Sequence, residues 1–245
     1  MYTFDSRVRY SETDESGHLS PLSVINYLQD CSTFQSEKLG MGVQWLRDHH
    51  RAWFLNSWRI LADRYPALGE KIRIGTFAYG FKGIYGYRHF FIQDEAGNFP
   101  VRADSIWFLV DTDTSMPTRP TEEYTAPYMA DPEQVDLHMG ETKRKIPLPK
   151  ELQQIGEIRI QRHHLDTNHH VNNAQYVDIA LDAAGIHAPW EIQAEYRRAA
   201  VLGDTLSILS GKETEGRQVI SLADGEGNPY AVVRCGRKGA SSEGK

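Results

Sequence analysis

Apolar and polar residues follow a helical spacing in two long segments of the chain. In the later segment, four small or apolar residues recur at that spacing: Ala174, Val177, Leu181 and Ala184. Asn172 and Asn173 precede this run and are favoured helix caps, and Gly185 follows where a helix commonly ends. The pattern therefore predicts a helix that begins near Asn173 and ends before Gly185.

The earlier segment begins with Ser20-Pro21, a favoured pair for a helix cap and first turn. We expect a long helix from there to about Leu39. Gly40 follows directly and supplies a residue that terminates helices.

Strand periodicity follows the earlier helix. Ile72 and Ile74 alternate with Lys71 and Arg73. A second alternating set lies on one face of the next run: Tyr85, Tyr87, His89 and Phe91. An Asp/Gly turn over residues 94–98 leads into a further run, 101–110, and the turn over residues 224–228 leads into 231–235 in the same way.

The two halves of the chain repeat the same landmarks. The same three residue types recur at one constant interval: Arg7, Asp14 and His18 in the first half correspond to Arg159, Asp166 and His170 in the second. Each half then consists of a strand, a long helix and several antiparallel strands, with about six strands in each half and about twelve in all. A helix that is small or apolar over much of its surface needs a curved sheet around it, so the predicted class is α+β. Chance similarity of short Asp/Gly turns is the alternative.

A proline-rich stretch separates the halves. Residues 117–149 hold six of the eleven prolines and few helix or strand patterns. We expect an N-terminal domain over residues 1–130, a linker over 131–150, and a C-terminal domain over 151–245 that carries the chemistry.

Composition and charge narrow the function. The chain has 245 residues, of which 40% are hydrophobic and 24% charged, as in an ordinary globular protein with a substantial core. Its net charge of −6 argues against nucleic acid as a partner, since phosphate-binding surfaces are usually basic. Two cysteines do not make a disulfide framework, and no apolar run is long enough to span a membrane. Without a signal-like start, the chain is expected to be cytoplasmic.

Candidate chemistry gathers just before the later helix. Asp166, Asn168 and His170 place a carboxylate, a carboxamide and an imidazole at every second position. Beside a helix N-terminus, such groups can act together with free backbone N–H donors on developing negative charge. Asn and Asp also crowd into loops and caps for local hydrogen bonding alone, and that interpretation stays open. A metal is not expected, because the nearby histidines come without a Cys or a His-Glu-x-x-His pattern.

Three stretches resemble motifs of the acyl-acyl carrier protein thioesterase family, which includes plant fatty acyl enzymes and bacterial relatives. Residues 165–176 resemble its Asp-x-Asn-x-His-Val-Asn-Asn signature, residues 195–198 its Glu-Tyr-Arg-Arg strand, and residues 63–69 its Asp-Arg-Tyr-Pro-x-x-Gly turn. The resemblance covers nearly the whole chain. It implies two hotdog folds in tandem, each a long central helix wrapped by antiparallel sheet.

The same resemblance implies an activity. It points to hydrolysis of a fatty acyl thioester held on the 4′-phosphopantetheine arm of acyl carrier protein, with release of free fatty acid and without a cofactor. Asp166, Asn168 and His170 are carried over as catalytic residues because they match the signature.

The chain departs from the family at one place. Plant members continue the Arg-Arg pair with Glu-Cys, whereas this chain has Ala199 and Ala200, so a Cys nucleophile there is excluded. Glu195 could replace the missing carboxylate, because residues 195 and 199 would face the same side if they lie on one strand. The alternative is that Glu195 is an exposed or salt-bridged carboxylate without a catalytic role, which is at least as common for a Glu on a strand.

Other functions stay open at this point. Asp14 and His18 resemble the Asp motif of single-hotdog thioesterases that act on coenzyme A esters, although Ser16 stands where the second half has Asn. An acyl-coenzyme A thioesterase, a catalytically weak acyl-binding protein and a hydratase are the alternatives. We expect Asp14 to be a structural turn residue, and both a monomer and a homodimer are compatible with the sequence.

Acyl carrier proteins are acidic, so the carrier is expected to dock on a local positive patch of this net-negative chain. The first candidates are Arg197 and Arg198 of the Glu-Tyr-Arg-Arg stretch and the basic residues 143–145. An internal ion pair or a plain solvated face is the alternative for each.

Overall fold

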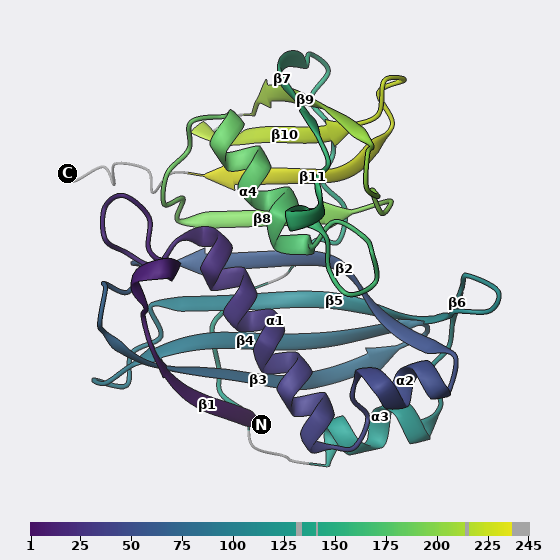
Figure 1. The fold of residues 1–245 in the computed structure, drawn as a ribbon. Coiled ribbons are helices and arrows are strands. Elements are labelled where there is room, and N and C mark those ends of the chain that lie inside the picture. Colours follow the sequence, from purple (N-terminus) through teal and green to yellow (C-terminus); the bar gives the residue numbers. More distant parts are fainter. Residues whose placement is uncertain (131–133, 141, 214–215, 237–245) are drawn as a thin grey trace. The chain divides into compact units, whose positions relative to one another are not determined.

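The structure is a computed structural model that describes residues 1–130, 134–140, 142–213 and 216–236. The chain forms two compact units, one made of Met1–Asn56 and Asp63–Thr142, the other of Ser57–Ala62 and Lys143–Lys245. In each unit one long helix lies against an antiparallel sheet (Figure 1), which confirms the predicted α+β class. The change from one unit to the other at Thr142 falls inside the predicted linker, and the domain limits themselves stay a prediction.

The first unit is built on a sheet with the order β1-β3-β4-β5-β2, and β6 pairs with β5. Its strands are β1 (Tyr2–Arg7), β2 (Arg51–Ala62), β3 (Lys71–Lys82), β4 (Tyr85–Asp94), β5 (Val101–Asp111) and β6 (Met116–Thr118). The pairs β1–β3, β3–β4 and β4–β5 are antiparallel. The six strands expected for the first half are therefore present.

Helix α1 (Pro21–Lys38) packs against β1 and β3 of this sheet. Ser20 caps it, because its side chain accepts the N–H of Ser23, and Pro21 occupies the first turn. The helix ends at Leu39, and Gly40 adopts a φ of 73°, a left-handed conformation that glycine reaches without strain. The predicted start and end of this helix are confirmed.

Two short helices were not predicted. They are α2 (Val43–Asp48) and α3 (Glu122–Met129), and α3 lies in the proline-rich stretch and contains Pro127. Tyr124 and Tyr128 of α3 are buried in a cluster with Met41 and Leu109. This burial stabilises a helix that local propensity disfavours, so the expectation of few regular elements in this stretch was wrong for residues 122–129.

The second unit contains β7 (Gln153–Arg159), β8 (Glu191–Tyr196), β9 (Thr205–Lys212), β10 (Gln218–Ala223) and β11 (Pro229–Gly236). Their order is β8-β11-β10-β9-β7, and Ser57–Leu61 at the end of β2 pair with β8. The described residues of the second half thus form five strands where about six were expected.

Helix α4 (Asn173–Ala183) packs against β10 and β11 of the second unit. The side chain of Asn172 accepts the N–H of Ala174, so Asn172 is the N-cap. At the other end Gly185 has a φ of 61°. The helix predicted from apolar spacing is confirmed at both ends.

The predicted internal repeat is confirmed in its hydrogen bonds. In the first unit the N–H of Asp14 donates to the carbonyl of His18 at 2.8 Å, and in the second unit the N–H of Asp166 donates to the carbonyl of His170 at the same distance. The turns Asp94–Asn98 and Asp224–Asn228 also agree: in each, the first residue's N–H bonds the last residue's carbonyl at 3.0 Å.

We predict that Gly75→Ala destabilises the first unit by about 1 to 3 kcal/mol, the usual cost of forcing extra volume into a packed site. Gly75 lies opposite Phe91 across β3 and β4, and a Cβ at position 75 would overlap the ring of Phe91, which is 2% exposed. Urea denaturation measures the change. Gly80→Ala on the same strand is the matched control, because a Cβ there meets nothing within 4 Å; equal losses in both variants would contradict the packing explanation.

Candidate active site

The carboxylate of Asp166 closes the loop that precedes α4. Its Oδ1 accepts the N–H of Asn168 at 2.8 Å and the N–H of His170 at 3.2 Å. These bonds fix the backbone of the three candidate residues relative to one another. Within the described part of the chain, Oδ2 of Asp166 has no hydrogen-bond donor, so one carboxylate oxygen remains available.

The loop leads directly to the positive end of α4. The N–H of Asn172 donates to the carbonyl of His164 at 2.9 Å, and Asn173 begins the helix. Asp166, Asn168 and His170 therefore lie within one short, hydrogen-bonded connection to a helix N-terminus, where negative charge is stabilised. His169 holds a φ of 62°, at the position where the first unit has Gly17 with a φ of 76°.

Two tyrosines hold the segment that faces this loop. The hydroxyl of Tyr176 accepts the N–H of Ala200 at 2.7 Å, and the carbonyl of Ala200 accepts the N–H of Val171 at 2.9 Å. The hydroxyl of Tyr196 donates to the carbonyl of Asn173 at 2.9 Å. Burial raises the pKa of Tyr176 to about 12 and that of Tyr196 well above its usual value, so both phenols are neutral near pH 7. They act here as hydrogen-bonding groups.

The first unit has the same loop but closes it differently. The hydroxyl of Ser16 donates to Oδ1 of Asp14 at 2.6 Å and lies 3.0 Å from Nδ1 of His18. The side-chain amide of Asn168, the counterpart of Ser16, is exposed and makes no hydrogen bond to another residue that the structure describes. Only the second loop thus presents an uncommitted amide beside a carboxylate and an imidazole.

Glu195 contacts residues outside the Asp166 loop. Strand β8 ends at Tyr196, so the premise that residues 195 and 199 share one strand face is wrong. The hydroxyl of Tyr196 reaches α4, and neighbouring strand residues point to opposite faces, which directs Glu195 away from α4. Its carboxylate accepts the N–H of Ile146 at 2.8 Å and pairs with Arg197 at 2.9 Å. Both contacts are made by Oε2 of Glu195, and its supporting role in the site stays a prediction.

The positions of the plant Glu-Cys pair carry no reactive group. Ala200 is fully buried, and its N–H and carbonyl bond Tyr176 and Val171. Ala199 is exposed. Neither position therefore supplies a carboxylate or a thiol, and Asp166, Asn168 and His170 stay the candidate residues.

Both arginines of the Glu-Tyr-Arg-Arg stretch make internal contacts. Arg197 bonds Glu195 and the carbonyl of Ile146. Arg198 pairs with Asp224 at 2.8 Å and stacks over the ring of Tyr230 at 3.9 Å. Its hydrogen bond lowers the pKa of Asp224 to about 2. The internal ion pair, given above as the alternative interpretation, is what the structure shows for both side chains.

The neighbouring histidines differ in burial. His164 is 6% exposed, and its Nδ1 accepts the N–H of Gln161 at 3.1 Å, whereas His163 is exposed. Burial, and to a lesser extent the adjacent His163, lower the pKa of His164. Among the residues described, no group of three or more His, Cys, Asp or Glu side chains is placed to hold a metal ion.

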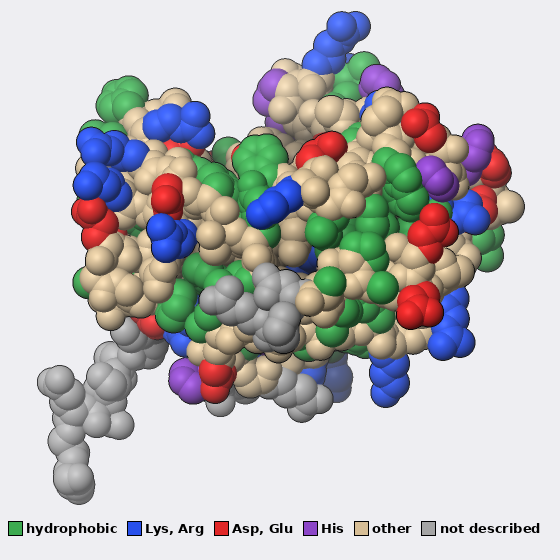
Figure 2. All heavy atoms as spheres, turned by 90° about the horizontal axis from the view of Figure 1, so that it is seen from below, with side chains coloured by type: hydrophobic (Ala, Val, Ile, Leu, Met, Phe, Trp, Pro, Cys, Tyr) green, Lys and Arg blue, Asp and Glu red, His purple; other side chains and the backbone are tan. Residues whose placement is uncertain are grey.

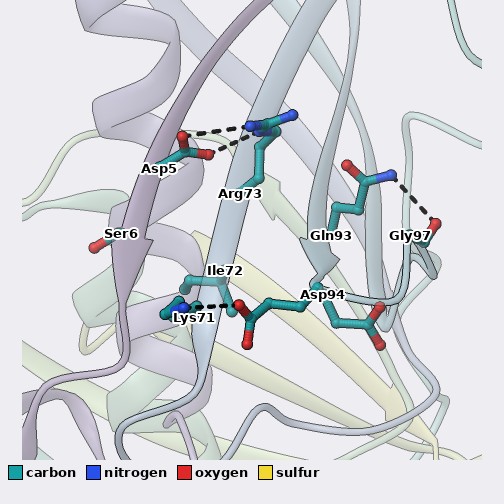
Figure 3. Close-up of a pocket in the computed structure, with 9 residues that line it drawn as sticks. Asp5, Ser6, Lys71, Ile72, Arg73, Gln93, Asp94 and Gly97 are labelled. Atoms are coloured by element: carbon teal, nitrogen blue, oxygen red, sulfur yellow. Dashed lines mark hydrogen bonds and ion pairs between the residues drawn. The ribbon is translucent and has the colours of Figure 1, made fainter.

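A groove of about 390 Å³ lies elsewhere, on the first unit between β1, β3 and the end of β4 (Figure 3). Its cations are paired: Arg73 bonds Asp5 at 2.7 Å and Lys71 bonds Glu95 at 2.9 Å. No residue of the Asp166 loop contributes to its lining. The lining of this groove therefore shares no residue with the candidate site.

Family comparison agrees with the sequence motifs. Residues 1–128 match the family model described as acyl-ACP thioesterase N-terminal domain, and residues 149–231 match the acyl-ACP thioesterase C-terminal domain. No described helix is long and apolar enough to cross a membrane.

Among curated proteins, the chain is 26% identical over 232 residues to oleoyl-acyl carrier protein thioesterase 2, chloroplastic, of Arabidopsis thaliana. It is 23% identical over 222 residues to dodecanoyl-[acyl-carrier-protein] hydrolase, chloroplastic, of Cinnamomum camphora. These matches cover 86% and 83% of this chain but only 63% and 57% of the two relatives. The chain thus spans about 60% of the length of these relatives.

Solved structures share the fold. An acyl-ACP thioesterase from Bacteroides thetaiotaomicron superposes with a TM-score of 0.85 at 20% identity, covering 95% of this chain and 96% of that one. A putative oleoyl thioesterase from Lactobacillus plantarum gives a TM-score of 0.81 at 22% identity, covering 96% and 94%. These likenesses confirm the tandem hotdog fold.

We predict that Tyr176→Phe loosens the segment that carries Ala200. The substitution leaves the buried Ala200 N–H without its acceptor, which costs about 1 to 3 kcal/mol. Amide hydrogen exchange should become faster at Ala200 and Val171. Tyr27→Phe is the matched control, because Tyr27 is a buried tyrosine of α1 that bonds Ser6 and Glu12 in the other unit. Unchanged exchange at Ala200 would show that the phenol does not hold this segment.

A second prediction concerns acid stability. The pKa of His164 is lowered in the folded protein, so protons bind the unfolded chain more readily, and the free energy of unfolding should decrease as the pH falls below the ordinary value of 6.5. His164→Asn keeps an acceptor for Gln161 and removes the titration. Urea denaturation between pH 7.5 and 5.5 should show a smaller pH dependence in His164→Asn, while His163→Asn should keep most of the wild-type dependence, because burial is the larger cause of the shift. Equal pH dependence in all three proteins would refute this role.

Proposed function

Because the chain belongs to the acyl-ACP thioesterase family, we propose that it hydrolyses fatty acyl thioesters carried on acyl carrier protein. Water adds its oxygen to the acyl carbon, the carbon–sulfur bond breaks, and the water protons end on the carboxylic acid and on the pantetheine sulfur. The products are free fatty acid and carrier protein with a free thiol. No cofactor takes part.

One observation carries this proposal: the second loop holds a carboxylate, an amide and an imidazole ahead of a helix N-terminus and leaves the amide uncommitted. In the first loop the equivalent hydroxyl, Ser16, is bonded to Asp14. The difference supports placing hydrolysis in the second unit. It also supports a structural role for Asp14, whose Oδ1 accepts the N–H groups of Ser16 and His18.

The contacts support a division of roles. Oδ1 of Asp166 holds the loop, so Oδ2 is the oxygen that orients the attacking water and receives its proton. His170 follows in the same loop, takes this proton from Asp166 and passes it to the leaving sulfur. The amide of Asn168 and the N-terminus of α4 stabilise the negative charge that develops on the thioester oxygen.

We place the reaction in the cytoplasm, with acyl carrier protein as the partner. Cys31 and Cys235 are both buried and lie outside any disulfide of the described residues, as is common in proteins of a reducing compartment. Either a monomer or a homodimer is consistent with a chain that contains two hotdog folds.

We predict that His170→Ala and Asn168→Ala each lower kcat for an acyl carrier protein thioester by about a hundredfold or more, as expected when a proton carrier or an oxyanion donor is removed. The melting temperature of Asn168→Ala should change little, because this side chain is exposed and makes no hydrogen bond to another described residue. Steady-state assays on matched acyl carrier protein and acyl-coenzyme A substrates measure both rates. Near-wild-type rates in both variants would place the site elsewhere.

Asp166→Asn and Asp14→Asn form a matched pair for this test. An Asn side chain still offers an oxygen to the loop N–H groups, so both loops should stay closed, and only Asp166→Asn should lose turnover. Loss in Asp14→Asn alone would move hydrolysis to the first unit.

A further inference from the structure

We infer that the acidic surface of the carrier protein docks on the segment Arg159–His163, which lies beside the Asp166 loop. The inference rests on the proposed function and names the surface that delivers its substrate. It also replaces the docking residues expected from the sequence.

The backbone of this segment is fixed on two sides. The N–H of Ile160 donates to the carbonyl of Asp204 at 2.8 Å, and the N–H of Gly203 donates to the carbonyl of Ile160 at 3.1 Å. At the end of the segment, the N–H of Leu165 donates to the carbonyl of Arg162 at 3.2 Å, one residue before Asp166. The segment thus lies between the turn at Gly203 and the candidate catalytic loop.

Its positive charges are available. Arg159 and Arg162 are exposed, and neither makes an ion pair with any carboxylate in the described ranges of the chain. Glu157, on the same strand as Arg159, is the nearest acid in sequence and is also exposed. His163 adds an exposed imidazole. The positive electrostatic potential of such an arginine is not cancelled by a neighbouring carboxylate, and this potential steers an acidic partner toward the surface.

The cations expected from the sequence are less suitable. Arg197 and Arg198 are neutralised by Glu195 and Asp224. The basic residues 143–145 precede Ile146, whose N–H binds the carboxylate of Glu195 on the sheet face that points away from α4. A carrier bound there would approach from the side opposite to the Asp166 loop.

Apolar groups accompany the two arginines. Val201 and Leu202 are 44% and 51% exposed on the turn that bonds Ile160, and Val201 forms a bridge with His170. Charge and exposed apolar area beside one site suit a partner that presents acidic and apolar side chains together. An acidic carrier protein has this chemistry.

The first unit shows that the fold does not require these cations. Its counterpart of Arg162 is Tyr10, which is 83% exposed, and its neighbouring Arg9 is bonded to Glu12 at 2.8 Å. Arg7 is the counterpart of Arg159 and is also exposed. Among the described residues, only the second unit combines the candidate catalytic loop with two arginines that form no ion pair, and Arg7 provides a matched control position.

The test is the charge-reversed variant Arg159→Glu/Arg162→Glu. For a carrier-bound acyl substrate at low ionic strength, kcat/KM should fall by about tenfold or more, and its dependence on salt should become shallower. Hydrolysis of an acyl-pantetheine, which has neither phosphate nor protein, should keep its rate. Arg7→Glu should leave both rates unchanged.

Three results would overturn the inference: an unchanged kcat/KM on the carrier substrate, an equal loss in Arg7→Glu, or an equal loss on acyl-pantetheine with an unchanged melting temperature. If the double variant melts early, Arg159→Gln and Arg162→Tyr decide in its place. The second of these copies the residue that the first unit tolerates. Each should weaken carrier kinetics and leave acyl-pantetheine hydrolysis intact.

Binding separates this inference from the proposed function. Fluorescence anisotropy of labelled holo carrier protein requires no turnover. In one outcome, the wild-type protein binds the carrier, the charge-reversed variant does not bind it, and neither protein hydrolyses a thioester. Docking on this segment would then be supported, and the proposed hydrolysis would be wrong. If hydrolysis is normal and the reversed variant binds carrier as tightly as wild type, docking on this segment is wrong.

Discussion

The candidate site depends on the two hydrogen bonds that the carboxylate of Asp166 accepts from the backbone of its own loop. By accepting the N–H groups of Asn168 and His170, this carboxylate forces three polar residues into one closed loop immediately before α4. A loop without these bonds would not keep an amide and an imidazole at fixed positions relative to the helix dipole. Ordering the two side chains would then cost conformational entropy at each turnover. Tyr176 and Tyr196 extend this fixation to the helix start and to the facing segment.

The two units show how one local structure can serve two purposes. Asp14 closes its loop with the same backbone bonds as Asp166, so the carboxylate is first a folding device in both units. What differs is the residue two positions later. The Ser16 hydroxyl is hydrogen-bonded to Asp14, whereas the Asn168 side chain is exposed and makes no hydrogen bond to another described residue. The second unit also accepts a left-handed His169 where the first uses Gly17, a conformation that costs a non-glycine residue about 1 kcal/mol. Such a local cost is expected where position matters more than stability.

Sequence reasoning succeeded where the cause is local. Caps at Ser20 and Asn172, and glycines at positions 40 and 185, fix helix ends through contacts of a few residues, and these ends were predicted correctly. It failed where the cause lies across the fold. Helix α3 forms because Tyr124 and Tyr128 are buried in a cluster with Met41 and Leu109, and residues 195 and 199 share no strand face because β8 ends at Tyr196. The ion-pair partners of Arg197 and Arg198 could not be predicted either, because they depend on tertiary structure that the sequence does not specify locally.

Pairing decides which charges of this chain can act at a distance. On the face shown in Figure 2, Lys and Arg side chains are interspersed with Asp and Glu. Arg64, for example, bonds both Glu70 and Asp94, and a cation neutralised in this way contributes little field beyond its own contact and little stability at an exposed position. A protein of net charge −6 can therefore attract an acidic partner only where cations are left unpaired. Arg159 and Arg162 meet this condition beside the loop that Asp166 closes, so the distribution of ion pairs, more than the number of basic residues, determines where such a partner is drawn.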